Sequence, residues 1–476
     1  MDARIKDWQP ELSDRSGPKF RALANALREA ARSGTLPPGT RLPPMRDMAW
    51  KLGVTTGTVA RAYQVAAAEG VIESHVGRGS FIAAPRPRQD MLQPLVYESI
   101  DSPVRADGPV DLRIPHLPDC GQAAIIGRHM AETGADLDAD ILDYTPLSRD
   151  QRCRQAVLNW MSDRDLGPVA VGDLVLTHGG QHAITLVMAL TLADQAQGVM
   201  AEALTYPGMR HAARLTRAEV FPVATDAQGM LPEALDQAAR KTGARLVALT
   251  PSAQNPTLAG MGPERRQQII EVARRHDLQV LEDECYAPTP RPDAPPSLRA
   301  LAPERVWHVS SLSKIIAAGL RFGMMICPEG MGAAGRVAAQ HSHMGLSQPI
   351  TGLVTRLMES GDAEAIAARV QSEVADRLAL ARDCLAPLTT ASQPGVPMLW
   401  LPLPKPWRAE DFVARAALAG VILRPASDFH AIPRPQAAPV EAVRIALNCR
   451  LPRERLAEGL RLVAELAQSD PGQGPA

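Results

Sequence analysis

Apolar residues near the start of the chain recur with the period of a helix. Phe20, Leu23 and Leu27 stand at positions i, i+3 and i+7, so residues 19–34 predict a helix with one apolar face. Proline and glycine in "TLPPGTRLPP" then break the chain before a shorter helical segment at residues 45–52. A turn and a third helix follow in "GVTTGTVARAYQVAAAEG". This order predicts a helix-turn-helix.

Two short β-prone segments follow the third helix, around the glycines of "VIESHVGRGSFIA". They predict a small hairpin, which would form the wing of a winged helix-turn-helix DNA-binding domain. The alternative is a small three-helix domain with a solvated basic face.

After residue 110 the pattern changes to short β-prone runs that alternate with helical stretches. The β-prone runs include "DLVLTHGG", "AEVFPVA", "RLVALTP", "LQVLEDE" and "RVWHVSS", and the helical ones include "QHAITLVMALTLA" and "GPERRQQIIEVARRH". Strands that alternate with helices predict an α/β domain with a largely parallel sheet. In such sheets the functional site lies at the carboxyl ends of the strands.

A proline-rich segment separates these two patterns. The run "AAPRPRQDMLQPLVYESIDSPVRADGP" has little apolar periodicity and is typical of a semi-extended linker. At 476 residues the chain is also too long for a single core. We therefore expect a DNA-binding domain at residues 1–84, a linker at residues 85–110 and a larger domain at residues 111–470.

The charge distribution changes the expectation for DNA binding. Hydrophobic residues make up 45% of the chain and charged residues 22%, which suits a globular protein with a large core. The formal net charge is -1, so the chain as a whole has no general attraction for nucleic acid. The first 84 residues nevertheless carry 12 Lys or Arg against 8 Asp or Glu. DNA binding is therefore expected from the first domain alone.

Targeting and metal signals are absent from the sequence pattern. The start, "MDARIKDWQPELSD", lacks a basic segment followed by an apolar run, and no stretch approaches the roughly 18 apolar residues of a membrane span. We therefore expect a cytoplasmic protein. The six cysteines form no CxxC pair, so we expect reduced thiols, no disulfide and no bound metal.

Side chains around the third helix are the candidates for DNA contact. The start of a recognition helix enters the major groove, and neighbouring basic side chains bind phosphates or base edges. The candidates, including one from the hairpin, are Arg41, Arg46, Thr55, Thr56, Thr58, Arg61 and Arg78.

The whole stretch "LPPGTRLPPMRDMAWKLGVTTGTVARAYQVAAAEGVIESHVGRGSFI" resembles the winged helix-turn-helix of GntR-type bacterial regulators. The resemblance implies that double-stranded operator DNA is a partner. Those regulators often carry an arginine at the start of the recognition helix, where this chain has Thr56 and Gly57. This departure favours Arg46, Thr55, Thr56 and Arg61 as the side chains that read the operator.

Polar residues follow several of the predicted strands in the larger domain. Gly179, Gly180 and Gln181 in "THGGQHA" lie between a strand and a helix, where backbone N–H groups can hold a phosphate; a simple tight turn is the alternative. Asp283 in "VLEDECY" can pair with a cationic ring nitrogen unless it is solvated. Tyr206 in "TYPG" suits stacking on a planar ligand, or a place in the core.

Lys314 follows a predicted strand in "RVWHVSSLSK". A lysine that is shielded from water has a lowered pKa and exposes a nucleophilic amine, which is what Schiff-base chemistry requires. Ser311 before it and Arg321 after it can bind a phosphate. A surface lysine before a helix is the alternative.

Taken in order, the motifs "TPLSR", "HGGQHA", "TYPG", "QNPT", "EDECY", "SLSK" and "GLRFG" resemble the fold-type I, aspartate-aminotransferase-like proteins that bind pyridoxal 5'-phosphate. The resemblance covers roughly residues 111–470 and implies a large, parallel-rich α/β sandwich with a smaller C-terminal α+β subdomain. It implies that Lys314 forms the internal aldimine with the cofactor. The other implied contacts are Asp283 to the pyridinium nitrogen, Tyr286 and Asn255 to the ring hydroxyl oxygen, Tyr206 stacked on the ring, Gly180, Gln181, Ser311 and Arg321 on the phosphate, and Tyr144 on the partner subunit's phosphate.

Two arginines near the end of the chain are the candidates for effector binding. Arg444, in "AVRIALN", resembles the arginine that binds an amino acid's carboxylate in these proteins. Arg424, in "RPASDF", is a further basic candidate, with a solvated arginine as the alternative.

A GntR-like module joined to such a domain is the architecture of the MocR subfamily of transcriptional regulators, which the chain resembles over nearly its full length. The resemblance implies a homodimeric, DNA-binding regulator in which an effector amine or amino acid displaces Lys314 from the cofactor by transaldimination. Two alternatives stay open. One is an active aminotransferase with an appended DNA-binding domain, in which Lys314 also acts as the general base. The other is a binding module that has lost its cofactor.

Overall fold

A computed structural model of the chain describes residues 8, 10, 19–32, 35–37, 39–68, 71–75, 79–83, 108–144, 146, 148–192, 198–286, 294–386, 388–432 and 439–470. Contacts within the chain divide it into two units, residues 1–101 and residues 102–476. The domain boundaries expected at residues 84 and 110 stay predictions, because residues 84–107 lie outside the described part of the chain.

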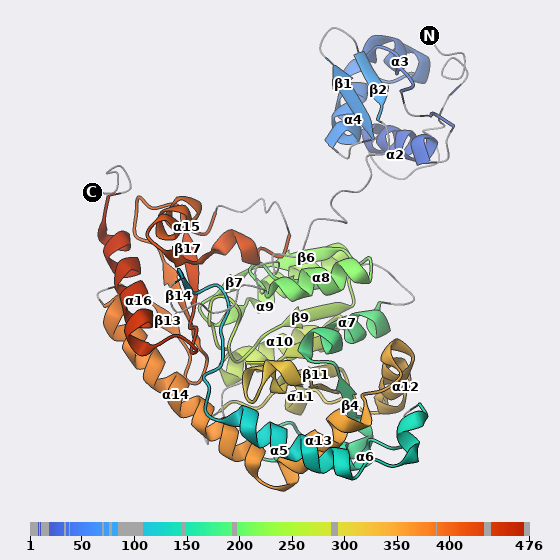
Figure 1. The fold of residues 1–476 in the computed structure, drawn as a ribbon. Coiled ribbons are helices and arrows are strands. Elements are labelled where there is room, and N and C mark those ends of the chain that lie inside the picture. Colours follow the sequence, from blue (N-terminus) through green and yellow to red (C-terminus); the bar gives the residue numbers. More distant parts are fainter. Residues whose placement is uncertain are drawn as a thin grey trace. The chain divides into compact units, whose positions relative to one another are not determined.

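Three helices and a hairpin form the first unit (Figure 1), as the hydrophobic pattern predicts. The elements are α2 (Lys19–Arg32), α3 (Met45–Leu52), α4 (Thr56–Ala68), β1 (Ile72–His75) and β2 (Gly79–Ile82). Leu23 and Leu27 of α2 are fully buried against Val59 and Tyr63 of α4. Strands β1 and β2 pair antiparallel from Ile72 opposite Ile82 to His75 opposite Gly79. The unit is therefore a winged helix-turn-helix.

A seven-stranded sheet forms the centre of the second unit. Its strands lie in the order β4 (Leu174–Thr177), β12 (Gly323–Ile326), β11 (Val306–Ser311), β10 (Gln279–Asp283), β9 (Leu246–Leu249), β5 (Val199–Glu202) and β6 (Val220–Val223). Strand β12 runs antiparallel to both of its neighbours, and the other paired strands are parallel. The carboxyl ends of β4, β5, β10 and β11 therefore lie at the same edge of the sheet.

Helices cover both faces of this sheet (Figure 1), because successive strand residues point to opposite sides. Leu246 and Ala248 of β9 pack against one set of helices, and Val247 and Leu249 pack against the other. The first set is α7 (Gly180–Thr191), α8 (Pro207–Leu215) and α12 (Gly332–His343), and the second is α9 (Pro232–Thr242), α10 (Pro263–Arg275) and α11 (Leu298–Leu301). This arrangement confirms the predicted α/β fold.

A smaller sheet forms a subdomain toward the end of the chain. Its strands lie in the order β13 (Ala391–Ser392), β14 (Met398–Pro402), β17 (Ala442–Ala446) and β16 (Arg424–Pro425). Around it lie α15 (Ala409–Leu418), α16 (Arg453–Gln468) and the pair of β15 (Val421–Ile422) with β3 (Val110–Asp111). Its apolar side chains join those of the long helix α14 (Asp362–Leu385) in one core.

Further helices complete the second unit. These are α5 (Gln122–Ala135), α6 (Gln151–Trp160), α13 (Gln348–Glu359) and the short 3-10 helices η3 (Ala139–Leu142), η4 (Val171–Asp173), η5 (Leu312–Lys314), η6 (Ala318–Leu320) and η7 (Ala426–Phe429). A small hairpin joins β7 (Thr225–Asp226) to β8 (Gly229–Met230). Among the described helices, none has both the length and the apolar character needed to cross a bilayer.

Candidate functional site

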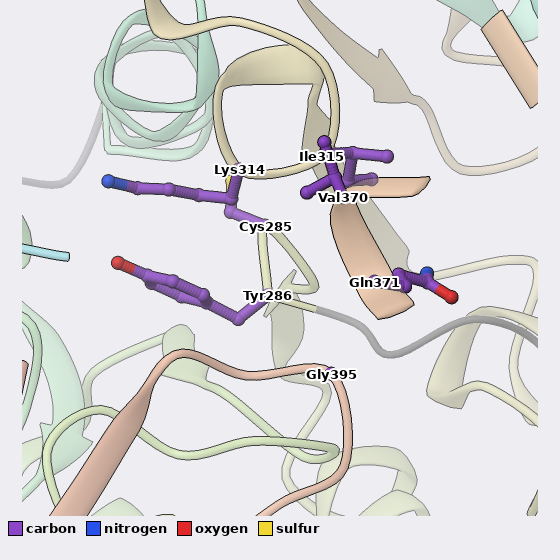
Figure 2. A pocket seen from close by; sticks show the side chains of 7 residues that line it. All are labelled: Cys285, Tyr286, Lys314, Ile315, Val370, Gln371 and Gly395. Carbon is purple, nitrogen blue, oxygen red and sulfur yellow. The ribbon is translucent and has the colours of Figure 1, made fainter. Parts of the chain in front are cut away.

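The carboxyl end of β11 places Lys314 beside the end of β10. Ser311, the last residue of β11, is buried, and its hydroxyl accepts a hydrogen bond of 3.3 Å from the Ser313 amide. This local hydrogen bond caps the turn of η5, from which the lysine side chain leaves the sheet. Lys314 Nζ lies 5.5 Å from the centroid of the Tyr286 ring, and Figure 2 shows the two side chains extending in the same direction. Lys314 therefore lines a pocket rather than standing alone on the surface.

The acidic end of β10 is buried, so the solvated alternative for Asp283 is wrong. Asp283 is 6% exposed, and its Oδ1 accepts a hydrogen bond of 3.0 Å from the Cys285 amide. Burial raises the pKa of this carboxyl. A cationic ring nitrogen would offset that cost, because an opposite charge favours the ionised carboxylate. Burial also raises the pKa of the Tyr286 hydroxyl and of the Cys285 thiol, so both are neutral at pH 7.

The start of α7 forms a cradle of backbone amides. Gly179 has φ of +84°, and a Cβ there would lie 2.8 Å from Arg321 Nη2. Gly180 leaves no room for a side chain, because a Cβ would collide with Cys285 Sγ. Gln181 donates a hydrogen bond of 2.9 Å to the carbonyl of Gly208. Free helix N–H groups at this point suit an anion, and a phosphate in particular.

Arg321 approaches the same cradle from the other side. Its backbone has φ of +46°, a left-handed conformation that costs free energy for a residue with a side chain. Its Nη2 donates a hydrogen bond of 3.1 Å to the carbonyl of His178, which precedes the two glycines. Ser313 Oγ is buried without a hydrogen-bond partner among the described residues. The cradle therefore has a guanidinium beside it.

Asn255 and Arg444 connect the loop after β9 to the smaller sheet. Asn255 is 4% exposed, and its Oδ1 accepts a hydrogen bond of 2.9 Å from Arg444 Nη1. Arg444 lies on β17 and also donates to the carbonyl of Arg113. Arg424 on β16 is 4% exposed, so the solvated alternative for this arginine is wrong.

The two remaining tyrosines differ in their surroundings. Tyr206 precedes α8 and packs against the core beneath α7, next to the cradle of backbone amides. Tyr144 follows η3 and is 77% exposed. Contact of Tyr144 with a partner subunit's phosphate therefore stays a prediction, as do the roles of the other residues toward a cofactor.

The candidate DNA contacts lie in the first unit. Arg41, Arg46, Thr55, Thr56 and Arg61 are exposed, and Thr58 is half-buried. Thr55 Oγ1 accepts a hydrogen bond of 3.2 Å from the Thr58 amide, so Thr55 caps α4. The Arg61 guanidinium lies 4.5 Å from the Phe20 ring centroid. Arg78 lies outside the described residues.

The pocket also contains residues that the sequence pattern did not single out. Cys285 lines it beside Lys314 and Tyr286, and Val370 and Gln371 of α14 line the side away from which the Lys314 amine points (Figure 2). These α14 residues lie more than 50 positions from the lysine and carry no local motif. The position of Cys285, two residues after Asp283 at a strand end, was the one available signal.

Glu202, at the end of β5, was also missed. It is fully buried, and its Oε2 accepts hydrogen bonds from Gln254 Nε2 at 3.2 Å and from the Thr250 amide at 3.3 Å. Burial raises the pKa of Glu202 from its ordinary value of 4.5 to about 8, so the carboxyl is mostly protonated at pH 7. Because Gln254 precedes Asn255, this neutral acid helps to fix the loop at the pocket.

The pKa of Glu202 predicts a pH dependence of stability. The folded chain holds a proton that the unfolded chain releases above its ordinary pKa, so the free energy of unfolding is expected to fall as the pH rises from about 5 to 8. Glu202→Gln should remove this loss, making the variant more stable than wild type at pH 8 by on the order of a few kcal/mol. Denaturant midpoints at several pH values measure this. Glu233→Gln, on the exposed start of α9, is the control, and identical pH slopes for wild type and Glu202→Gln would refute the assignment.

The residues present fit pyridoxal 5'-phosphate. Lys314 offers an amine, buried Asp283 a carboxylate for the ring nitrogen, and the cradle at Gly180 a place for the phosphate that a Cβ would fill. The guanidinium of Arg321 lies beside that cradle, and the hydroxyl of Ser313 is buried without a hydrogen-bond partner among the described residues. This donor set matches an aldehyde-bearing, cationic ring with a phosphate arm.

Comparisons with known proteins agree with this geometry. Residues 121–462 match the family model of aminotransferase class I and II, and residues 20–82 match that of bacterial regulatory proteins of the gntR family. YdeF of Bacillus subtilis, an HTH-type transcriptional regulator, is 25% identical over 96% of both chains. The probable rhizopine catabolism regulatory protein MocR of Rhizobium meliloti is 26% identical over 66% of both chains.

A solved structure supports the same assignment. LysN, the α-aminoadipate aminotransferase of Thermus thermophilus, was solved in complex with N-(5'-phosphopyridoxyl)-L-leucine. It is 26% identical and superposes with a TM-score of 0.63 over 76% of this chain and 92% of LysN. The chain thus belongs to the aminotransferase class I and II family, in the MocR-type arrangement in which a GntR-type DNA-binding module precedes the aminotransferase-like domain.

Proposed function

We propose that the protein is a pyridoxal 5'-phosphate-dependent transcriptional regulator that senses an amine or amino acid at Lys314. One observation carries this proposal: a chain that begins with a DNA-binding module also places a lysine amine beside a buried carboxyl and a phosphate cradle. The bound cofactor would supply an aldehyde that condenses reversibly with amines, so that an effector amine can take the place of the lysine.

The chain's own residues would hold the two ligands as follows. Asp283, Tyr286 and Asn255 would orient the ring, and Tyr206 would stack on it. Gly180, Gln181, Ser311 and Arg321 would bind the phosphate. Arg444 would bind an effector carboxylate, because its guanidinium is hydrogen-bonded to Asn255, which would itself contact the ring. The effector changes DNA binding if it binds two arrangements of the chain with different free energies.

Reduction with borohydride tests this proposal. The protein is loaded with cofactor, reduced, digested and mapped by mass spectrometry. A phosphopyridoxyl group on the Lys314 peptide is the expected result, and a label elsewhere or nowhere would overturn the proposal. Incubation with amino donors and a keto acid tests the enzyme alternative, in which many turnovers per subunit are expected.

We also propose a cytoplasmic homodimer. The exposure of Tyr144 supports this, because Leu142 and Ile141 beside it are also exposed, by 85% and 41%. An exposed apolar segment of this kind is typical of an interface. Sedimentation of the cofactor-loaded protein tests the assignment, and a monomer that still binds the cofactor with full affinity would contradict it.

Arg46→Ala and Arg61→Ala are each expected to weaken operator binding by about 1–3 kcal/mol, because both side chains are exposed, Arg46 at the start of α3 and Arg61 midway along α4. Affinity is measured on duplexes selected by the wild-type chain from random sequence. Arg21→Ala, exposed on α2, is the matched control. Melting curves separate lost DNA contacts from lost packing of Arg61 on Phe20. Wild-type affinity in both variants would show that the recognition surface lies elsewhere.

A further inference from the structure

Two buried arginines face the same side of the smaller sheet. Arg424 of β16 lies directly opposite Arg444 of β17 in the antiparallel register, so their side chains share one face. Each residue is only 4% exposed. Each guanidinium carbon lies 4.7 Å from the centroid of the Phe429 ring. The two guanidinium carbons are therefore no more than twice that distance apart.

Hydrogen bonds connect this pair to the loops that carry Asn255 and Tyr206. Arg444 Nη1 donates to Asn255, and the carbonyl of Phe429 accepts a hydrogen bond of 2.7 Å from the Thr205 amide, next to Tyr206. Phe429, whose ring both arginines approach, is thus hydrogen-bonded through its backbone to the loop that carries Tyr206. A ligand held at Arg444 would therefore have Arg424 within reach.

The guanidinium of Arg424 has only part of its hydrogen-bonding capacity satisfied. Its Nε forms an ion pair of 2.9 Å with Asp428 Oδ2, and that carboxylate is 28% exposed. Its Nη2 is buried without a hydrogen-bond partner among the described residues. Arg210 of α8 donates a hydrogen bond of 2.8 Å to the carbonyl of Asp428, which brings a third guanidinium to the same place. Guanidinium charges that are gathered away from water are costly unless an anion joins them.

We propose that the effector is an amino acid with a second acidic group, and that Arg424 binds this second group while Arg444 binds the α-carboxylate. This inference rests on the proposed function, because it names the class of molecule sensed at Lys314. Asp428 occupies Arg424 until the effector arrives, and it can then turn toward solvent because it is already partly exposed. A neutral amino acid would gain the contact with Arg444 but leave Nη2 of Arg424 unused.

Matched acids and amides test this inference on the full, cofactor-loaded chain. L-glutamate is compared with L-glutamine, and L-aspartate with L-asparagine, by titrating the visible absorbance of the lysine-bound cofactor. In the wild type, the acid of at least one pair is expected to half-saturate at a concentration at least tenfold lower than its amide. Arg424→Gln should bring this ratio close to one by weakening the binding of the acid. Arg382→Gln, on the exposed side of α14, should keep the wild-type ratio.

A second variant covers the case in which Arg424→Gln fails to fold. Asp428→Asn removes the competing carboxylate at a partly exposed position, so it is expected to bind the acid several-fold more tightly than wild type does. An equal preference for acid and amide in the wild type, a visible band that responds to neither acid, or a preference that survives in Arg424→Gln would overturn the inference. The complete absence of a visible band would instead refute the proposed function.

Discussion

Lys314→Ala is expected to abolish the visible absorbance of the cofactor-loaded protein and, with it, the response of DNA binding to any effector. In the proposed function the absorbance depends on the amine of this residue, which the turn of η5 holds beside the Tyr286 ring. Alanine supplies no amine for the cofactor's aldehyde, so the loss should be complete rather than graded. Absorbance spectra and operator affinity, each measured with and without added amino acids, check this result.

Two controls separate this effect from unfolding. Lys241→Ala removes an exposed lysine from α9 and should leave both the spectrum and the effector response unchanged. Lys314→Ala itself should keep its affinity for operator DNA in the absence of effector, since the DNA-binding module has a hydrophobic core of its own. A wild-type spectrum in Lys314→Ala would mean that another amine holds the cofactor, and the sensing site would then lie elsewhere.

Local patterns were sufficient to predict the elements that carry the site. Helix α3 spans the residues expected from the breaks at proline and glycine, and each β-prone run quoted from the larger domain is a strand of the seven-stranded sheet. The sequence also predicted that Asp283 and Lys314 lie together, since the carboxyl ends of parallel strands meet at one edge of a sheet. The period of the hydrophobic residues and the polar residues that follow a strand are local properties, so a single sequence was enough to detect them.

Long-range packing could not be predicted in the same way. Arg424 and Arg444 stand opposite each other because of the register between β16 and β17, which the alternation of residues along one strand does not determine. Glu202 is neutral because of burial beneath other elements, and a glutamate at a strand end has the same sequence pattern whether it is buried or exposed. The solvated alternative for Arg424 was wrong for the same reason, because the local sequence does not show that this arginine is buried.

The cradle at the start of α7 depends on both local sequence and long-range packing. Gly180→Ala tests whether the phosphate binds there. The glycine pair is visible in the sequence, but its contact with Cys285 is visible only in the fold, where a Cβ at position 180 would collide with Sγ. Overpacking at a buried site costs about 1–3 kcal/mol, so the dissociation constant for pyridoxal 5'-phosphate should rise by about fivefold to 150-fold. Titration of the cofactor-free protein measures this.

Cys285→Ala in the same chain removes the obstructing sulfur, and the double variant should recover most of the lost affinity. Wild-type affinity in Gly180→Ala would mean that the phosphate does not depend on this close approach, while a double variant as weak as the single one would mean that the methyl group obstructs the phosphate itself rather than the thiol.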